Sequence, residues 1–549
     1  MKHHKISLLV LLFFCLCEKS FAQTKYKYLV LLKDKNNSPY SVNSPLAYLS
    51  QKSIERRFKQ GITIKTSDLP PNPTYIFDIL QTGATVIYKS RWMNAALVEA
   101  TETQKNTILN LPFVKGIEFD RPLKQVRKKD IFDKFAIEKI ESLNYGNATA
   151  QIQLLGADIM HEQGFHGEGM LVALLDDGFL NANLSTCLQN LFLNNKVVKI
   201  YDFVDNDNTV YEQGGHGTAV LSTMAGYLDN QMISPAFGAS VALFRTEDGT
   251  SETPLEEANW LFAAEMADSL GADIISSSLG YSTFDNATDN YTPAMMDGKT
   301  ALSTRAADLA TERGMVVVIS AGNSGSDPSW QIITAPADAD SVLAIGAVTR
   351  DGIYAPFSSR GNTADGRIKP DVVAVGSGTA LCNTSGNATA GNGTSFSAPL
   401  VAGLVAGFWQ ANPYLTAQEV TRCIRKSGHQ FASPTIQLGY GYANFTRANI
   451  VVQNEFLISA IEPNSDLVSI TILPSNKSDV ELKFANSLIN NQLRTTFINQ
   501  TTKQILYQDT FTLNNNQTTK TISFDTISPD ILLRIEDLTQ KKTLKIIRW

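Results

Sequence analysis

Short apolar runs alternate with helical stretches between about residues 148 and 452, and this alternation restricts the fold more than any other feature. Strands that are apolar along nearly their whole length are typical of parallel sheets whose two faces are both covered by helices. One of the helical stretches between the runs is 255–270. The sequence therefore predicts an α/β fold with a parallel sheet and crossover helices. The five runs lie at 171–175, 240–244, 273–276, 315–319 and 341–345.

The size and charge of the chain limit what it can do. It has 549 residues, of which 43% are hydrophobic and 18% are charged, which is enough for about three or four domains. The 47 Lys and Arg residues against 53 Asp and Glu give a net charge of -6. Because a protein that holds nucleic acid needs a basic surface to pair with phosphates, we expect no nucleic-acid partner.

The first 22 residues have the pattern of a cleaved secretory signal. A basic start is followed by an apolar stretch at 6–17 and a small-residue end at Ala22. Neither this stretch nor a later one reaches the roughly 20 apolar residues of a transmembrane helix. We therefore expect a protein without a transmembrane segment that is secreted or attached to the cell surface. Lipid attachment through Cys15 or Cys17 is an alternative, although bulky residues precede both.

Three cysteines remain after the signal, Cys187, Cys382 and Cys423. An odd and sparse set is not a disulfide framework in a chain of this size. At most one disulfide can form, and we favour three buried thiols over a bridge. The sequence has no CxxC pair or His/Cys cluster that would indicate zinc, so we assign no metal to the functional site.

Composition and periodicity divide the rest of the chain into four parts. Residues 23–130 alternate strand-like and helical segments, as in a small α+β domain. Residues 131–150 belong to a charged and polar stretch without periodicity, which predicts a linker. Residues 151–452 hold the predicted parallel sheet. Residues 453–549 carry short alternating segments rich in Asn, Gln and Thr, which are typical of a small β-sandwich.

Three short segments carry residues suited to nucleophilic catalysis. Asp176 ends the first apolar run, at the edge of the sheet where ligands bind in open α/β folds. His216 lies between glycines that let another group approach its imidazole closely. Ser395 lies at a predicted helix start, where the positive end of the helix dipole stabilises an oxyanion. Taken singly, each has a structural alternative: a turn aspartate, a packing histidine and a helix-capping serine.

Two further strand ends contribute polar groups. Asn323 follows one apolar run, and its amide can donate to a developing negative charge or hold a left-handed turn. Ser278, Leu279 and Gly280 follow another run, where the sheet edge can pair with an extended peptide or be a plain strand end.

An acid, an imidazole and a serine hydroxyl in the chain order Asp, His, Ser together make a nucleophilic triad. The segments that carry them resemble the signature segments of subtilisin-like serine proteases. The resemblance covers about residues 145–449 and implies a subtilisin-like fold and an endopeptidase that hydrolyses peptide bonds through an acyl-enzyme. The matching segments are Leu175-Asp176-Asp177-Gly178, His216-Gly217-Thr218, Ser320-Ala321-Gly322-Asn323, Phe357-Ser358-Ser359-Arg360-Gly361, Lys369-Pro370-Asp371 and Gly393-Thr394-Ser395-Phe396-Ser397-Ala398-Pro399.

The resemblance implies a role for each of these residues. Ser395 would be the nucleophile, His216 the general base and then acid, and Asp176 the carboxylate that orients the imidazole. Asn323 would complete the oxyanion hole together with the Ser395 backbone N–H. The segment 278–280 would pair with the backbone of the substrate.

Three positions depart from the family pattern. Asp177 stands where the family usually has Thr or Ser, and we choose Asp176 as the catalytic acid because it falls at the family's aspartate position. Ala219 replaces a frequent second histidine outside the triad. Ser277 alters the strand that would pair with substrate, which leaves cleavage specificity open.

The flanking parts also resemble parts of known proteases. Residues 23–130 resemble the family's inhibitory propeptide, which would assist folding of the slow parallel sheet and block the cleft until it is removed. An unrelated binding domain is the alternative. Residues 453–549 resemble the sorting domains of type IX secretion in Bacteroidetes, with a passive or adhesive β domain as the alternative. The supporting residues are Leu533-Arg534 and the basic-aliphatic ending 541–549, whereas the usual Pro-Asn-Pro appears only as Leu473-Pro474-Ser475-Asn476.

The resemblance implies polypeptide substrates and no organic cofactor. Family members often bind structural calcium, and Asp205-Asn206-Asp207-Asn208 is an oxygen-rich candidate, with a solvated loop as the alternative. Two other functions stay open at this point. One is an inactive scaffold that binds peptides in the cleft, and the other is an adhesin that acts through its C-terminal β domain.

Overall fold

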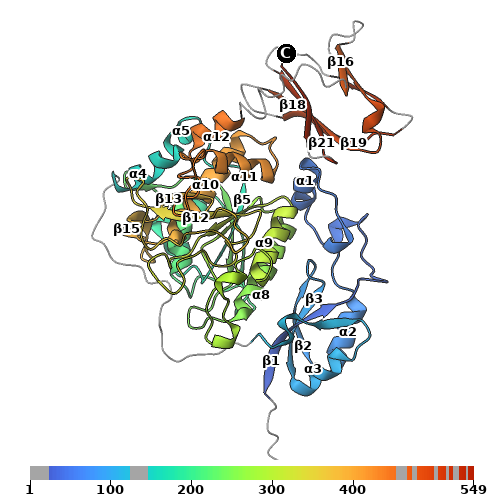
Figure 1. Cartoon of the computed structure of the whole chain (residues 1–549), viewed down its shortest axis with the longest axis vertical. Helices are drawn as coiled ribbons and strands as arrows, with labels where there is room; N and C mark the ends of the chain where they lie inside the picture. The colour runs from blue at the N-terminus through green and yellow to red at the C-terminus, as the bar shows by residue number, and fades with distance from the viewer. Residues whose placement is uncertain are drawn as a thin grey trace, which may run out of the picture.

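Figure 1 shows three units along the chain: an N-terminal domain in blue, a large central domain and a C-terminal domain in red. The predicted signal at 1–22 lies outside the residues described by the computed structural model, as does the segment with Pro474. The predicted linker at 131–150 lies outside them up to residue 145, and its last residues begin helix α4 (Gly146–Leu155). The described residues are 24–123, 146–452, 467–472, 479–499, 505–514, 518–523, 531–539 and 542–548.

The central domain is built on a seven-stranded sheet of order β13-β12-β11-β10-β5-β9-β6. Every neighbouring pair of strands is parallel, so the predicted α/β fold is confirmed. The edge strands are β6 (Val197–Asp202) and β13 (Val372–Val375), which are not among the five apolar runs. The five runs form the inner strands β5 (Leu171–Asp176), β9 (Ser240–Arg245), β10 (Ile274–Ser277), β11 (Val316–Ser320) and β12 (Leu343–Val348).

Helices cover both faces of this sheet (Figure 1). Val172 and Leu174 of β5 belong to one hydrophobic core, and Ala173 and Leu175 belong to another. Since side chains alternate across a strand, β5 is buried on both faces. The first core holds α7 (His216–Ala225), α10 (Thr394–Ala411), α11 (Ala417–Lys426) and α12 (Phe445–Val452), and the second holds α8 (Pro254–Leu270) and α9 (Leu302–Glu312).

Shorter elements complete the central domain. They are α5 (Ala157–Glu162), α6 (Gln189–Leu193) and the strand pairs β7 (Tyr227–Leu228) with β8 (Met232–Ile233) and β14 (Thr379–Cys382) with β15 (Ala388–Gly391).

The N-terminal domain folds around an antiparallel sheet of order β2-β3-β1-β4. One face of this sheet packs in a core of its own that includes Val30, Ile79 and Val98. The other face packs on the central domain, because Leu29 and Leu97 share a core with residues of α8. The elements are β1 (Lys25–Leu32), α1 (Gln51–Lys59), α2 (Pro73–Gln81), β2 (Thr85–Ser90), β3 (Ala95–Thr101), α3 (Glu102–Leu109) and β4 (Val114–Ile117).

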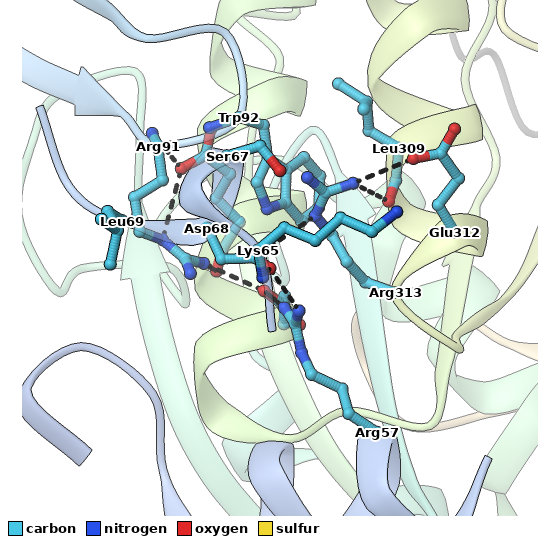
Figure 2. A network of polar contacts seen from close by, with 12 residues as sticks. Arg57, Lys65, Ser67, Asp68, Leu69, Arg91, Trp92, Leu309, Glu312 and Arg313 are labelled. Atoms are coloured by element: carbon cyan, nitrogen blue, oxygen red, sulfur yellow. Dashed lines mark hydrogen bonds and ion pairs between the residues drawn. The ribbon is translucent and has the colours of Figure 1, made fainter. Parts of the chain in front are cut away.

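Buried ion pairs also join the N-terminal domain to the central domain. Asp268, near the end of α8, accepts hydrogen bonds from Arg57 (2.7 Å) and Arg91 (3.1 Å). Figure 2 shows the adjoining part of the network, where Asp68 pairs with Arg57 (3.0 Å) and with Arg313 of the central domain (3.2 Å). These side chains are buried, so salt screens the pairs less than it screens surface pairs.

The C-terminal domain consists of two antiparallel sheets, of orders β16-β17-β20 and β19-β18-β21-β22. Residues from both sheets, such as Leu482 and Phe497, share one core, which confirms the predicted small β-sandwich. The domain touches its neighbours at α1, where Gln508 donates to the Lys59 carbonyl (3.0 Å), and at α11, where Arg534 pairs with Glu419. The strands are β16 (Val468–Ile472), β17 (Asp479–Phe484), β18 (Gln492–Asn499), β19 (Ile505–Thr512), β20 (Thr519–Ser523), β21 (Ile531–Asp537) and β22 (Lys542–Arg548).

The preference for three free thiols is wrong. Cys187 and Cys382 form a disulfide, and Cys423 is a buried free cysteine. The two bonded residues are 195 positions apart in the sequence, so only the folded chain brings them together. Among the helices of the described residues, none has the length and apolar character needed to cross a bilayer.

Candidate active site

Asp176 and His216 meet at the carboxyl edge of the sheet. Asp176 is the last residue of β5 and is fully buried, and its Oδ1 lies 2.6 Å from Nδ1 of His216, the first residue of α7. A Cβ at Gly217 would lie 2.1 Å from the Gly178 carbonyl oxygen, so only glycine lets α7 start this close to β5. With a carboxylate at Nδ1, that nitrogen carries the imidazole proton, and Nε2 is the nitrogen able to accept another.

Asp177 points to a different partner. Its Oδ1 accepts a hydrogen bond from the Gly217 backbone N–H (3.1 Å), and its own backbone N–H donates to Asp176 Oδ1 (2.9 Å). Burial and the charge of Asp176 raise the pKa of Asp177 to about 7. Asp176 Oδ2 has no hydrogen-bond partner within the described part of the chain. When its carboxyl is protonated, Asp177 can therefore supply a hydrogen-bond donor next to Asp176 Oδ2, an acceptor that has no other donor among the described residues.

Ser395 lies in the first turn of α10, one residue before an aromatic ring that packs near the same imidazole. The ring of Phe396, the next residue, has its centroid 5.7 Å from that of His216. Ser395 is buried, with 7% of its surface exposed. Its Oγ donates a long hydrogen bond to the Ser278 carbonyl (3.4 Å), and the Ser278 hydroxyl donates to the Ser395 carbonyl (2.7 Å). The serine is thus held against the end of β10.

The Asn323 side chain has a fixed orientation. Its Oδ1 accepts hydrogen bonds from the backbone N–H (2.9 Å) and the hydroxyl (3.0 Å) of Thr394. A Cβ placed on Gly393 would lie 3.6 Å from Asn323 Nδ2 and 3.7 Å from the Ser395 backbone nitrogen. Two N–H donors therefore border the same space beside Gly393, an arrangement that can stabilise an oxyanion.

A cavity of about 190 Å³ opens in front of Ser395. Its lining includes Ser278, Leu279, Gly280 and Asn323, so these residues lie around one space. Other lining residues are Glu247, Glu252, Ser282, Ser320, Gly322, Ser324, Thr334 and Thr394.

Sequence reasoning missed Glu247, Glu252 and Thr334. Glu247 has a usable signal, because it follows β9, the neighbour of β5, at the same carboxyl edge of the sheet as Asp176. Thr334 has no such signal. It follows no strand, and the pairing of the next residue, Ala335, with Tyr281 brings it beside Gly280.

The oxygen-rich segment 205–208 does not fit a calcium site. Arg245 Nη1 donates to both Asp202 and Asp205 at 2.7 Å, and Asn206 Oδ1 accepts from the Tyr201 hydroxyl (2.6 Å). The Arg245 guanidinium therefore already neutralises Asp205, one of the two carboxylates of the segment, and its positive charge would repel a calcium ion there.

Two known domain families match parts of this chain. The subtilase family matches residues 167–443, about half of the chain, and the peptidase S8 propeptide domain of Bacteroidota matches residues 27–134. Subtilisin DY of Bacillus licheniformis is 32% identical over 269 residues, which cover 49% of this chain and 87% of that protein. Subtilisin E of Bacillus subtilis strain 168 is 29% identical over 346 residues, or 62% of this chain and 77% of that protein.

A third relative is matched over a smaller share of its own length. The membrane-bound transcription factor site-1 protease of Mus musculus is 29% identical over 263 residues, which cover 46% of this chain and 22% of that protein. The family match spans the whole parallel sheet, and the propeptide match spans the N-terminal domain. The chain therefore belongs to the subtilase family, whose members are serine-type endopeptidases, and it carries a propeptide domain of the same family.

Proposed function

We propose that this protein is a secreted serine endopeptidase that works through Ser395, His216 and Asp176. The observation that carries the proposal is the 2.6 Å contact between Asp176 and the His216 imidazole, beside the helix turn that holds Ser395. Asp176 is chosen over Asp177 because its carboxylate faces the ring, whereas that of Asp177 faces the Gly217 backbone.

In the first half of the reaction, His216 Nε2 takes the proton of the Ser395 hydroxyl while Oγ attacks the carbonyl carbon of the peptide bond. Asp176 holds the ring and stabilises its cation. The negative charge that develops on the carbonyl oxygen is received by the Ser395 N–H and Asn323 Nδ2. His216 then gives its proton to the leaving amine, and an ester to Ser395 remains.

In the second half, a water molecule replaces the amine. His216 takes a proton from the water as the water attacks the ester carbonyl, and then returns it to Ser395 Oγ as the acyl group leaves. The segment 278–280 pairs with the substrate backbone and holds the scissile bond in front of Ser395. Besides the substrate and this water molecule, the reaction uses only side chains and backbone groups of this chain, with no organic cofactor.

We further propose that the N-terminal domain, residues 23–130, inhibits the precursor and that residues 453–549 direct type IX secretion or surface attachment. The N-terminal domain is held by an apolar face and by buried ion pairs, which supports a tight intramolecular complex. The sorting role has support only from the resemblance of the sequence and from the β-sandwich fold.

A serine-directed fluorophosphonate tests the central proposal. We expect it to label the mature protein at Ser395, and we expect Ser395→Ala to abolish both labelling and cleavage of a denatured protein substrate. In a subtilisin, loss of the serine costs about six orders of magnitude in kcat. Ser397→Ala is the matched control in the same helix turn, because the Ser397 hydroxyl bonds the Thr394 carbonyl instead.

Failure of wild type to be labelled would favour the inactive peptide-binding scaffold. An adhesin would retain its binding to cell surfaces in the Ser395→Ala protein. N-terminal sequencing of both secreted proteins adds a test of maturation. If both lose the N-terminal domain at the same bond, another protease cuts it and self-processing is excluded.

A further inference from the structure

The cavity in front of Ser395 is acidic. Glu247 and Glu252 line it, and none of its lining residues, all in the described part of the chain, is Lys, Arg or His. Glu256 joins the other two glutamates, since one carboxylate oxygen of each lies within 4.8 Å of the others. Burying like charges so close together is unfavourable unless a cation or several donors lie nearby.

Neighbouring groups hold these carboxylates in place. The Tyr281 hydroxyl donates to Glu247 Oε1 (2.6 Å), and Glu247 is only 1% exposed. Glu256 accepts from the backbone N–H groups of Asp248 (2.9 Å) and Thr253 (3.1 Å) at the start of α8. Burial and the charges of Glu247 and Glu256 raise the pKa of Tyr281 well above its ordinary value. The cluster is therefore a fixed feature of the cavity wall, and half-buried Glu252 lies at its accessible side.

A second observation in the same cavity also indicates a polar ligand. Thr334 is 5% exposed, and its Oγ1 has no hydrogen-bond partner among the described residues. A Cβ on Gly280 would lie 2.2 Å from this oxygen, and one on Gly322 would lie 3.2 Å from it. The hydroxyl therefore faces the space between the two glycine walls. A buried hydroxyl without a partner is costly, and a bound polar group would satisfy it.

We propose that this cavity selects substrates that carry an arginine or lysine side chain close to the scissile bond. The inference rests on the proposed protease function. The cationic head group pairs with Glu247 and Glu252, and the Thr334 hydroxyl accepts from a second polar group of the bound peptide. An aliphatic side chain in the same place would bring no positive charge to the carboxylates and would displace water without replacing its hydrogen bonds.

Hydrogen bonds between charged groups set the expected size of the preference, about 10- to 100-fold in kcat/KM. The first measurement uses the mature enzyme on a mixture of peptides of random sequence, with the products sequenced by mass spectrometry. We expect arginine and lysine to be enriched about 10-fold or more at one position near the cleaved bond. An active enzyme without this enrichment would overturn the proposal.

The second measurement uses two peptides that differ only at that position, with arginine in one and the neutral isostere citrulline in the other. We expect Glu247→Gln and Glu252→Gln each to lower the ratio of kcat/KM for the two peptides toward one. Glu162→Gln, which changes an exposed glutamate of α5, should keep the wild-type ratio. Glu252 is half-buried, so its variant stays informative even if Glu247→Gln does not fold.

The outcomes separate this inference from the proposed function. Wild type that neither cleaves peptides nor reacts with a fluorophosphonate contradicts the protease itself. If wild type is active but its glutamate variants lose activity toward both peptides equally, only the proposed selectivity is contradicted. If the glutamate variants lose activity toward both peptides and added Ca²⁺ restores it, the carboxylates hold a metal ion. This result would also overturn the proposal.

Discussion

Two regions of the central domain bury acidic side chains, and they differ in the groups that surround them. At the interface with the N-terminal domain, the carboxylate of Asp268 meets the guanidinium groups of Arg56, Arg57 and Arg91. All of these side chains are buried. The negative charge near the end of α8 therefore has positive neighbours that the N-terminal domain supplies.

In the candidate active site, two aspartates lie beside each other instead. Asp177 is next to Asp176, and the nearby Arg245 donates through Nε to the backbone carbonyl of Asp177 (3.1 Å). The pKa values of two aspartates follow this difference. Burial raises the pKa of Asp268, but the charges of the three arginines outweigh burial and hold this pKa well below its ordinary value. The pKa of Asp177, in contrast, is raised to about 7.

This difference in neighbouring charges indicates different roles for the two regions. A buried carboxylate whose cationic partners are already in place forms a complete set of ion pairs. Here those ion pairs bind the N-terminal domain to the central domain. A buried carboxylate that lies beside another acid keeps its proton more readily. Variants that remove or neutralise one carboxylate in each region test whether this contrast is real.

The largest effect is expected at the interface. In the full chain that carries Ser395→Ala to prevent self-cleavage, Asp268→Ala leaves three buried arginines without their shared carboxylate. Breaking a buried pair in this way costs about 3–5 kcal/mol. We expect the free energy that holds the N-terminal domain on the central domain to fall by that amount, measured by denaturant-induced release of the N-terminal domain.

Asp340→Ala is the control. Asp340 is an aspartate of the same domain, but its side chain is 74% exposed and it makes a long ion pair with Arg367 (3.8 Å). It should change the same free energy by less than about 1 kcal/mol. If Asp268→Ala behaved like Asp340→Ala, the arginines would be solvated in the complex, and the contrast between the two regions would fail.

The sequence predicts the inner part of the fold better than its edges. The inner strands are continuous apolar runs because helices bury both of their faces. The edge strand β6 is only partly buried and includes Lys199, so it has no such run. The edge strand β13 has only four residues and follows closely after a proline. β6 therefore escapes a rule that depends on complete burial, whereas β13, all of whose residues are buried, shows that a short buried strand can also be missed.

Some residues of the candidate site can likewise be predicted from the sequence, and others cannot. Asp176, His216 and Ser395 stand out because each lies close to glycine at a strand end or helix start, which is a local signal. Thr334 and the partners of Asp268 give no local signal, since Asp268 lies 211 positions from Arg57 and 177 from Arg91. Contacts of this kind depend on how the domains pack, and a single sequence does not encode them in any short pattern.

The second prediction concerns pH and Asp177. An acid whose pKa is raised on folding stabilises the protein below its unfolded-state pKa, and that contribution is lost as the pH rises through the folded pKa. For Asp177 this interval runs from 3.8 to about 7. We expect the Ser395→Ala chain to lose stability over this pH interval, and we expect Asp177→Asn to remove most of that loss, about 4 kcal/mol.

Denaturant unfolding at a series of pH values measures this effect. The side-chain amide that Asp177→Asn introduces keeps an acceptor for the Gly217 N–H and adds a permanent donor for Asp176, so the fold itself should be retained. Parallel stability curves for the two proteins would mean that Asp177 is ionised without cost. The candidate active site would then resemble the interface in its charge balance, and the contrast between the two regions would fail.

The smallest effect is expected at the rim of the interface network, where Glu312 pairs with Arg313 at 3.5 Å (Figure 2). Arg313 is buried and also pairs with Asp68, but the Glu312 side chain is 66% exposed. Water already solvates such a carboxylate, so Glu312→Ala in the Ser395→Ala chain should change the release of the N-terminal domain by less than about 1 kcal/mol. Added salt should shrink this effect further while leaving that of Asp268→Ala nearly intact. A Glu312→Ala effect as large and as insensitive to salt as that of Asp268→Ala would show that burial does not decide the strength of these ion pairs.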